Sequence, residues 1–247
     1  MIRGLVALMG LLAGWEALVR ATDVPHFILP GPLRVGTALI ANFEFIMANA
    51  AVTLLEIVLG MAMGLLLGLS CALALAASRT ARAWLLPLVV ASQAIPVFAI
   101  APLLVLWLGF GIASKVAAAA LIVFFPVASA FYDGLARTNP GWLDLARTMG
   151  ATKSATLLHL RLPAALPAFA SGARVAAAIA PIGAVIGEWV GASAGLGFLM
   201  LQSNAQMRVD LMFAALTVLA AFALGFYALV DKAMALLVPW DPKRIDR

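Results

Sequence analysis

The sequence predicts an all-α membrane protein with six transmembrane helices. Of its 247 residues, 65% are hydrophobic and 11% are charged, whereas water-soluble proteins carry about a quarter charged residues. The mean hydropathy is +1.09. A helix that crosses a bilayer needs roughly 20 apolar residues. Apolar segments that approach or exceed this length, each with at most one charged residue, lie at 4–19, 57–78, 83–114, 116–132, 164–187 and 211–230.

The first segment, 4–19, has an alternative interpretation as a signal peptide, because Arg3 precedes its apolar stretch. Trp15 and Glu16 occupy the place where a small-residue cleavage site would fall. We therefore predict that this segment is the first membrane helix. Glu16 and Arg20, four residues apart, would share one face near its far end.

The Lys and Arg residues predict the orientation, because positively charged loops stay in the cytoplasm. If the N-terminus is inside, the outer segments hold only Arg20, Arg34, Lys115 and Arg208 of the 16 Lys and Arg residues. The remaining 12 lie in or beside inner segments. Both termini are therefore predicted to be cytoplasmic, and the net charge of +5 reflects topology and not nucleic-acid binding.

Two apolar segments carry marks of helix packing or of a polar interior. Gly60, Gly64 and Gly68 recur every fourth residue, so they share one helix face on which a second helix can approach closely. Segment 83–114 contains three prolines, Pro96 among them. A proline frees a backbone carbonyl, which in a bilayer must be covered by protein or reached by water. This segment is therefore expected to face the inside of an assembly.

The longest polar stretch, 133–163, separates two apolar segments on the predicted inner side. Residues 142–149 are predicted to form a short helix with Gly150 as its C-terminal stop. Residues 152–161 are predicted to form a second short helix that Pro163 ends. Two short helices at a sharp angle make a rigid knob, which a partner could push.

The spacing in this stretch resembles the EAA loop of binding-protein-dependent ABC importer permeases: Glu-Ala-Ala, three residues, Gly, nine residues, then Ile-x-Leu-Pro. Asp144 stands in place of the Glu, Leu145 in place of the first Ala and Leu160 in place of the Ile. The alternative is an ordinary basic loop. The resemblance implies a loop at about 134–166 that couples the chain to an ATPase through Asp144, Leu145, Ala146, Gly150, Leu160, Leu162 and Pro163.

The resemblance covers about residues 27–240, and it is strongest to the nitrate, sulfonate, taurine and thiamine-precursor group. The sequence at 92–96, Ser-Gln-Ala-Ile-Pro, and the run 182–191 carry it. It implies a type I importer permease fold with cytoplasmic coupling helices in one permease domain, 1–247, in the inner (plasma) membrane. The implied partners are a second permease copy, two ATPase subunits and an extracytoplasmic solute-binding protein.

The implied solute is a pyrimidine precursor of thiamine, with alkanesulfonate, taurine or nitrate as the alternative. Predicted pathway residues are Gln93, Pro96, Glu188, Trp189 and Glu56. An acid at membrane depth is costly, by about 2.5–3.5 kcal/mol on insertion scales, so it usually faces a partner or a cavity. Two acids on the outer half suit a neutral or aminated ring better than an anion. The other interpretations are interhelical hydrogen bonds for the polar residues and an interfacial belt for the tryptophan.

Other function classes fit less well. No G-x-x-x-x-G-K-[ST] motif is present, so ATP and Mg²⁺ are expected on a partner ATPase, and no cofactor is expected in this chain. A channel or an ion-coupled carrier is an alternative class. A carrier needs titratable relays within the membrane or an inverted repeat, and we find no repeat across the two halves. Gly191-x-Ser193-x-Gly195 matches a serine-hydrolase motif, but it follows an apolar helix where a strand is required. We therefore expect a transporter subunit and not an enzyme.

Overall fold

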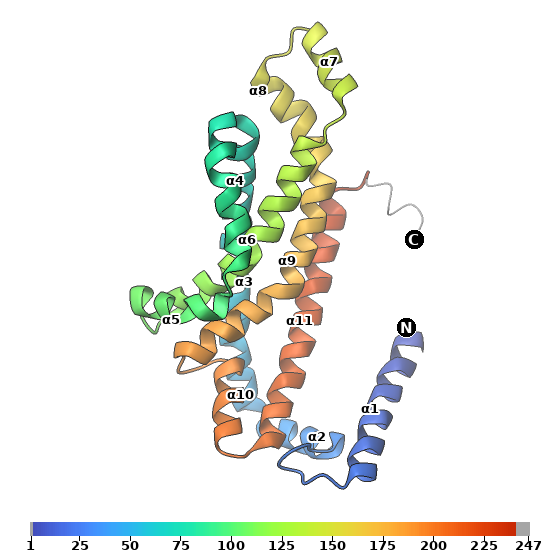
Figure 1. Cartoon of the computed structure of the whole chain (residues 1–247). Coiled ribbons are helices and arrows are strands. Elements are labelled where there is room, and N and C mark those ends of the chain that lie inside the picture. Colours follow the sequence, from blue (N-terminus) through green and yellow to red (C-terminus); the bar gives the residue numbers. More distant parts are fainter. Residues whose placement is uncertain (1, 241–247) are drawn as a thin grey trace.

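The computed structural model describes residues 2–240 and, except for residues 2–5 and 8, their side chains. Every regular element in this range is helical, with no strand (Figure 1), which confirms the predicted all-α class. The elements are α1 (Ile2–Thr22), α2 (Pro32–Ala41), α3 (Phe43–Ala77), α4 (Arg79–Ala94), α5 (Val97–Leu108), α6 (Ile112–Ala136), α7 (Pro140–Thr148), α8 (Lys153–Thr156), the π-helical turn η1 (Leu157–Arg161), α9 (Leu162–Gly191), α10 (Leu196–Ala205) and α11 (Val209–Leu237).

Four of the described helices are long and apolar enough to cross a membrane: α3, α6, the continuous helix 153–191 and α11. Helices α4 and α5 together make a fifth span if they are counted as one, although they bend by 104° at the break between them. All six predicted apolar segments lie on helices, and segment 83–114 is divided among α4, α5 and the start of α6. Because α1 is not among these spans, the count of six stays a prediction.

Helix α3 begins at Phe43, well before the uncharged stretch that starts at residue 57. The sequence criterion stopped at Glu56, because a carboxylate normally ends an apolar segment. In the structure Glu56 is buried inside the bundle and the helix passes through it. The expectation that Glu56 lies inside this helix at membrane depth is confirmed, and its burial comes from packing against other helices.

The core forms where α6 packs between α3 and α9. The predicted glycine seam of α3 lies against α6: a Cβ atom on Gly64 would overlap Val123, and one on Gly68 would come 2.8 Å from Val127 Cγ1. Val123, Val127 and Phe131 of α6 are fully buried at the centre of the resulting apolar cluster. The prediction of a packing seam is therefore confirmed.

Pro163 does not end a helix, contrary to the prediction, since the helix runs without a break over 153–191. The turn before the proline, Leu157–Arg161, is π-helical, and the N–H of Leu162 donates to the carbonyl of Leu157, five residues back. In a regular α-helix the proline ring would meet the carbonyl four residues earlier. A wider turn relieves that clash and lets the proline lie within one continuous helix.

Figure 1 shows the elements distributed along one elongated body. Helices α7 and α8 project from one end, and α2 lies at the opposite end together with the turn that joins α10 to α11. Helix α5 projects sideways from the middle. Helix α1 stands apart from the bundle, and its Trp15 ring lies 5.8 Å from that of Phe213 on α11.

Candidate functional site

Helix α7 has well-defined ends. At its start, the side chain of Asn139 accepts a hydrogen bond from the N–H of Gly141, 2.8 Å away. At its end, Gly150 adopts φ +73°, the left-handed conformation that favours glycine. The N–H of Ala151 then donates to the carbonyl of Ala146 (2.9 Å), and that of Gly150 to Arg147 (3.0 Å), which is a Schellman motif. The predicted stop at Gly150 is confirmed.

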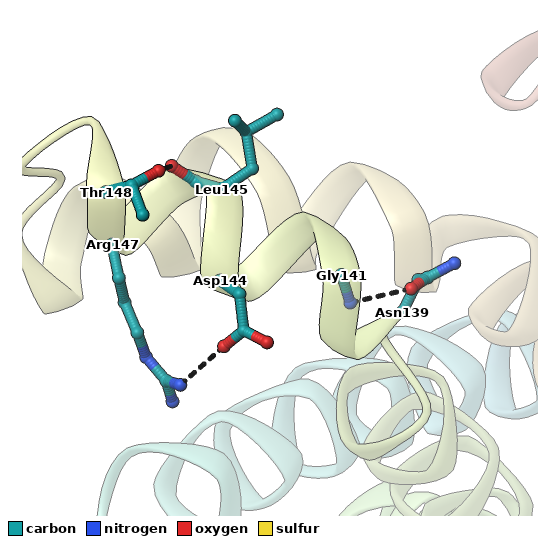
Figure 2. A network of polar contacts seen from close by, with 6 residues as sticks. All are labelled: Asn139, Gly141, Asp144, Leu145, Arg147 and Thr148. Atoms are coloured by element: carbon teal, nitrogen blue, oxygen red, sulfur yellow. Dashed lines mark hydrogen bonds and ion pairs between the residues drawn. The ribbon is translucent and has the colours of Figure 1, made fainter.

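The two faces of α7 differ in chemistry. Figure 2 shows Asp144 and Arg147 together on one side of the helix, joined by an ion pair of 2.8 Å, with Leu145 on the other side. The exposed fractions are 53% for Trp142, 60% for Leu145 and 77% for Met149. Large apolar side chains that are exposed next to charged residues mark an interaction surface.

A hollow of about 670 Å³ lies between α7 and the helix that follows it. Three of the predicted coupling residues, Leu145, Ala146 and Leu160, line it. The sequence separates them by up to 15 positions, and the reversal of the chain at Gly150 brings them together. The remaining wall residues include Trp142, Met149 and Ala155.

The knob made of α7, α8 and η1 is attached to the bundle at its base. Arg161 donates two hydrogen bonds, of 3.2 and 2.9 Å, to the carbonyl of Leu135 in the last turn of α6. Leu162 packs against the buried core. Of the seven predicted coupling residues, three therefore face the hollow, and Leu162 and Pro163 lie where the knob joins α9. The other two do not line the hollow: Asp144 pairs with Arg147, and Gly150 ends α7.

A second polar site lies deep in the bundle, around Glu188 near the end of α9. Its carboxylate accepts a hydrogen bond from Thr53 of α3 (2.6 Å) and from the N–H groups of Gly197 (2.5 Å) and Phe198 (3.2 Å). Those two N–H groups belong to the first turn of α10, which has no intrahelical partner for them. The buried carboxylate therefore caps α10.

The loop between α9 and α10 is fixed to α3 by two more hydrogen bonds. The side chain of Asn49 accepts from the N–H of Gly195 (2.8 Å), and that of Thr53 accepts from the N–H of Leu196 (2.7 Å). Gly195 has φ +114°, and a Cβ atom there would overlap the carboxyl group of Glu188. The second glycine of the apparent hydrolase motif thus makes room for a carboxylate.

The C-terminal end of α9 is capped by a cation. Lys115, at the start of α6, is buried and donates to the carbonyl of Phe110 (2.6 Å) and to that of Gly191, the last residue of α9. A cation at a helix C-terminus and an anion at a helix N-terminus both match the helix dipole. Glu56 lies beside Glu188 and Lys115, and its Oε2 atom has no hydrogen-bond partner among the described residues.

The five predicted pathway residues separate into two groups. Gln93, Pro96 and Trp189 are exposed, the first two at the break between α4 and α5. Glu56 and Glu188 are buried at a common depth, as predicted, but in a network within the chain. The geometry of Glu188 matches the alternative interpretation, an interhelical hydrogen bond, and its pathway role stays a prediction.

Several residues of these networks were not found from the sequence. Asn49 and Thr53 lie in α3 before the uncharged stretch 57–78, and no feature of the sequence marked their side chains as buried. Lys115 was assigned to an outer segment because a lone lysine between apolar stretches predicts a loop. Arg174, which interrupts the apolar segment 164–187, forms an ion pair of 2.6 Å with Asp231 of α11.

Comparison with known proteins decides the family. The family model described as the binding-protein-dependent transport system inner membrane component matches residues 60–240. This chain belongs to that family of ABC importer permeases. Such permeases work with an ATPase and a solute-binding protein, and they are transporter subunits and not enzymes.

Individual relatives agree with this membership. The permease is 54% identical over 221 residues to a probable ABC transporter permease of Haemophilus influenzae, covering 90% of each chain. It is 37% identical over 235 residues to the formylaminopyrimidine transport permease ThiX of Halalkalibacterium halodurans, covering 95% of this chain and 94% of that one. The resemblance to the group that includes thiamine-precursor permeases is thereby confirmed.

A solved structure supports the fold. The permease superposes on the MetNI methionine ABC transporter with a TM-score of 0.60 at 19% identity, covering 78% of this chain and 96% of that one. The type I importer permease fold predicted from the sequence is therefore confirmed. The hydrolase alternative fails as expected, because Gly191 ends a helix and no strand precedes it in the described chain.

Proposed function

We propose that this permease imports a pyrimidine precursor of thiamine, driven by an ATPase that binds the knob of α7, α8 and η1. In this proposal the knob end of the molecule and both termini are cytoplasmic, in the inner membrane. Two copies form the pathway on two ATPase subunits, which hold ATP and Mg²⁺. A binding protein delivers the solute on the opposite side.

The observation that carries the coupling role is the exposed apolar surface of α7. Trp142, Leu145 and Met149 are exposed, and they lie on or directly after α7, at one end of the elongated molecule (Figure 1). Such a surface needs a protein partner, because it lies beside charged groups that require water. Motion of the partner would pass through Arg161 and the continuous helix 153–191 into the bundle.

The break between α4 and α5 supports the proposed pathway. Backbone that leaves a helix at membrane depth is tolerated only where protein or a water-filled cavity covers it. Gln93 and Pro96 lie at this break, and α5 packs against α9, which carries Trp189. We propose that these three residues line the pathway and that Glu56 and Glu188 support it from within the bundle.

The solute class rests on the likeness to the formylaminopyrimidine permease. The test is uptake into proteoliposomes that contain the permease, its ATPase and its binding protein, with labelled formylaminopyrimidine or hydroxymethylpyrimidine. We expect uptake that requires both ATP and the binding protein. Uptake of taurine, an alkanesulfonate or nitrate in place of the pyrimidine would overturn the solute assignment and leave the family membership intact.

A further inference from the structure

The hollow in the knob is an apolar cavity that opens at the surface of the molecule. Trp142, Leu145 and Met149 form the wall on α7, and Ala155 and Leu160 form the opposite wall. Charged groups stand around it, including the pair Asp144 and Arg147 on the far face of α7. These charges place the opening in water, so a lipid chain is not a suitable occupant.

We infer that this hollow is a socket for an apolar anchor of the ATPase made of more than one side chain, because about 670 Å³ exceeds the volume of any single side chain. The inference rests on the proposed coupling function and deepens it: the permease receives an anchor from its partner as well as presenting a helix to it. Interfaces concentrate their binding energy in such anchors, which fill preformed pockets.

The polar groups at the hollow favour an apolar occupant. Thr156 already donates its hydroxyl hydrogen to the carbonyl of Thr152 (2.9 Å), and Nδ1 of His159 is bonded to the carbonyl of Ala155 (3.2 Å). A polar occupant would find few free partners there and would lose its own hydration. An apolar side chain loses nothing and gains the burial of its surface.

The charges around the hollow predict which charged group lies beside the anchor on the ATPase. Asp144 neutralises Arg147, and Asp133 lies 4.0 Å from Arg137, whereas Lys153 has no ion-pair partner within residues 2–240. Lys153 begins α8, on the same short segment as the wall residue Ala155. The partner is therefore expected to carry an acidic side chain beside its anchor, facing Lys153.

The walls are fixed before a partner arrives. The Schellman motif at Gly150 sets the chain reversal, and the hydroxyl of Thr152 accepts from the N–H of Ala155 (3.2 Å) at the start of the next helix. The second wall then continues rigidly into α9. A preformed socket loses little conformational entropy on binding, and it passes a push on the anchor directly to a membrane helix.

The decisive test compares substitutions at two adjacent small residues, Ala155 and Ser154, in purified permease reconstituted with its own ATPase. Ala155→Leu places a larger side chain in the hollow, where it takes the place of part of the anchor, and Ser154→Leu adds the same side chain at an exposed neighbour that does not line the hollow. We expect Ala155→Leu to weaken ATPase binding by about tenfold or more, because excluding one buried apolar side chain is worth at least that factor. Ser154→Leu should bind within about twofold of the parent, a difference of under 0.5 kcal/mol. Equal binding by Ala155→Leu and the parent would overturn the socket.

Leu145→Glu separates this inference from the proposed function. If it releases the ATPase while Ala155→Leu does not, the socket is wrong and the coupling surface stands. If Leu145→Glu keeps the ATPase at parental affinity, the proposed function itself fails.

A photoreactive benzoylphenylalanine in place of Trp142 gives a second measurement that does not depend on filling the hollow. We expect a crosslink to an apolar residue of the ATPase that has an Asp or Glu nearby. Crosslinks only to the second permease copy or to lipid would overturn the inference.

Discussion

Thr53 of α3 donates a hydrogen bond of 2.6 Å to Glu188 of α9, across 135 residues of sequence. The same hydroxyl oxygen accepts from the N–H of Leu196, and the same carboxylate caps the first turn of α10. One buried contact therefore sets the positions of α3, α9 and α10 together. It explains why an acid occurs at this depth without requiring that the solute touch it.

Replacement of Glu188 should mainly lower the thermal stability of the permease. Any change in the solute pathway should be secondary. In Glu188→Gln only one of the two terminal atoms can accept, so the NH2 group faces either the hydroxyl of Thr53 or the N–H groups of α10. This arrangement leaves a buried donor unpaired at a cost of about 1–3 kcal/mol. Thermal unfolding in detergent, followed by size-exclusion chromatography, should shift to lower temperature. Glu44→Gln, at an exposed acid of the same helix α3 as Thr53, is the control and should unfold like the parent.

A methyl group in the glycine seam should disrupt packing of α3 on α6. Gly64→Ala places a Cβ atom against Val123, and overpacking of this kind typically costs about 1–3 kcal/mol. Gly225→Ala in α11 adds the same atom where nothing lies within 4 Å. We expect the first variant to lose thermal stability in detergent and the second to match the parent. Equal stability of the two would show that the seam can open without cost.

The ion pair of Arg174 and Asp231 should hold α9 against α11. Either Arg174→Ala or Asp231→Ala leaves one charge without its partner, and each should lower the yield of folded permease from membranes. The exchanged pair, Arg174→Asp with Asp231→Arg, should recover part of that loss. If the double exchange lowers the yield of folded permease by the sum of the two single losses, the two residues do not form a stabilising pair.

The left-handed residue at the end of α7 should be replaceable by asparagine but not by valine. Gly150 has φ +73°, where a β-branched residue is strained by roughly 1–2 kcal/mol and asparagine much less. Gly150→Val should reduce solute-stimulated ATP hydrolysis in the assembled transporter, while Gly150→Asn should retain most of it. Full activity of Gly150→Val would show that coupling does not depend on the left-handed conformation at the end of α7.

The proposed orientation has a direct test in a variant whose Cys71 is replaced by serine. Single cysteines at Ser154 and Gln206, both exposed and at opposite ends of the molecule, should differ in labelling by an impermeant thiol reagent. Intact cells should react at Gln206 alone, and opened membranes at both. Labelling of Ser154→Cys in intact cells would reverse the orientation.

Local sequence determined the features that depend on near neighbours. Apolar length predicted helices at all six segments, four-residue spacing predicted the seam at Gly64, and the glycine at position 150 predicted the end of α7. These properties follow from hydrophobicity, helix period and backbone conformation within a few residues. The spacing from Asp144 to Pro163 likewise predicted the family.

Only the tertiary structure decided where the charged side chains lie and what surrounds them. Glu56 and Glu188 were expected at membrane depth and Lys115 in an outer segment, but only the fold shows what surrounds them. Each is buried, and a distant helix supplies its partners or a neighbouring charge. Pro163 resembles a helix end, yet a π-helical turn absorbs it. Burial of a charge and accommodation of a proline depend on atoms far away in the chain or on a local change of helix type. Neither can be read from the residue itself, whose intrinsic preference points the other way.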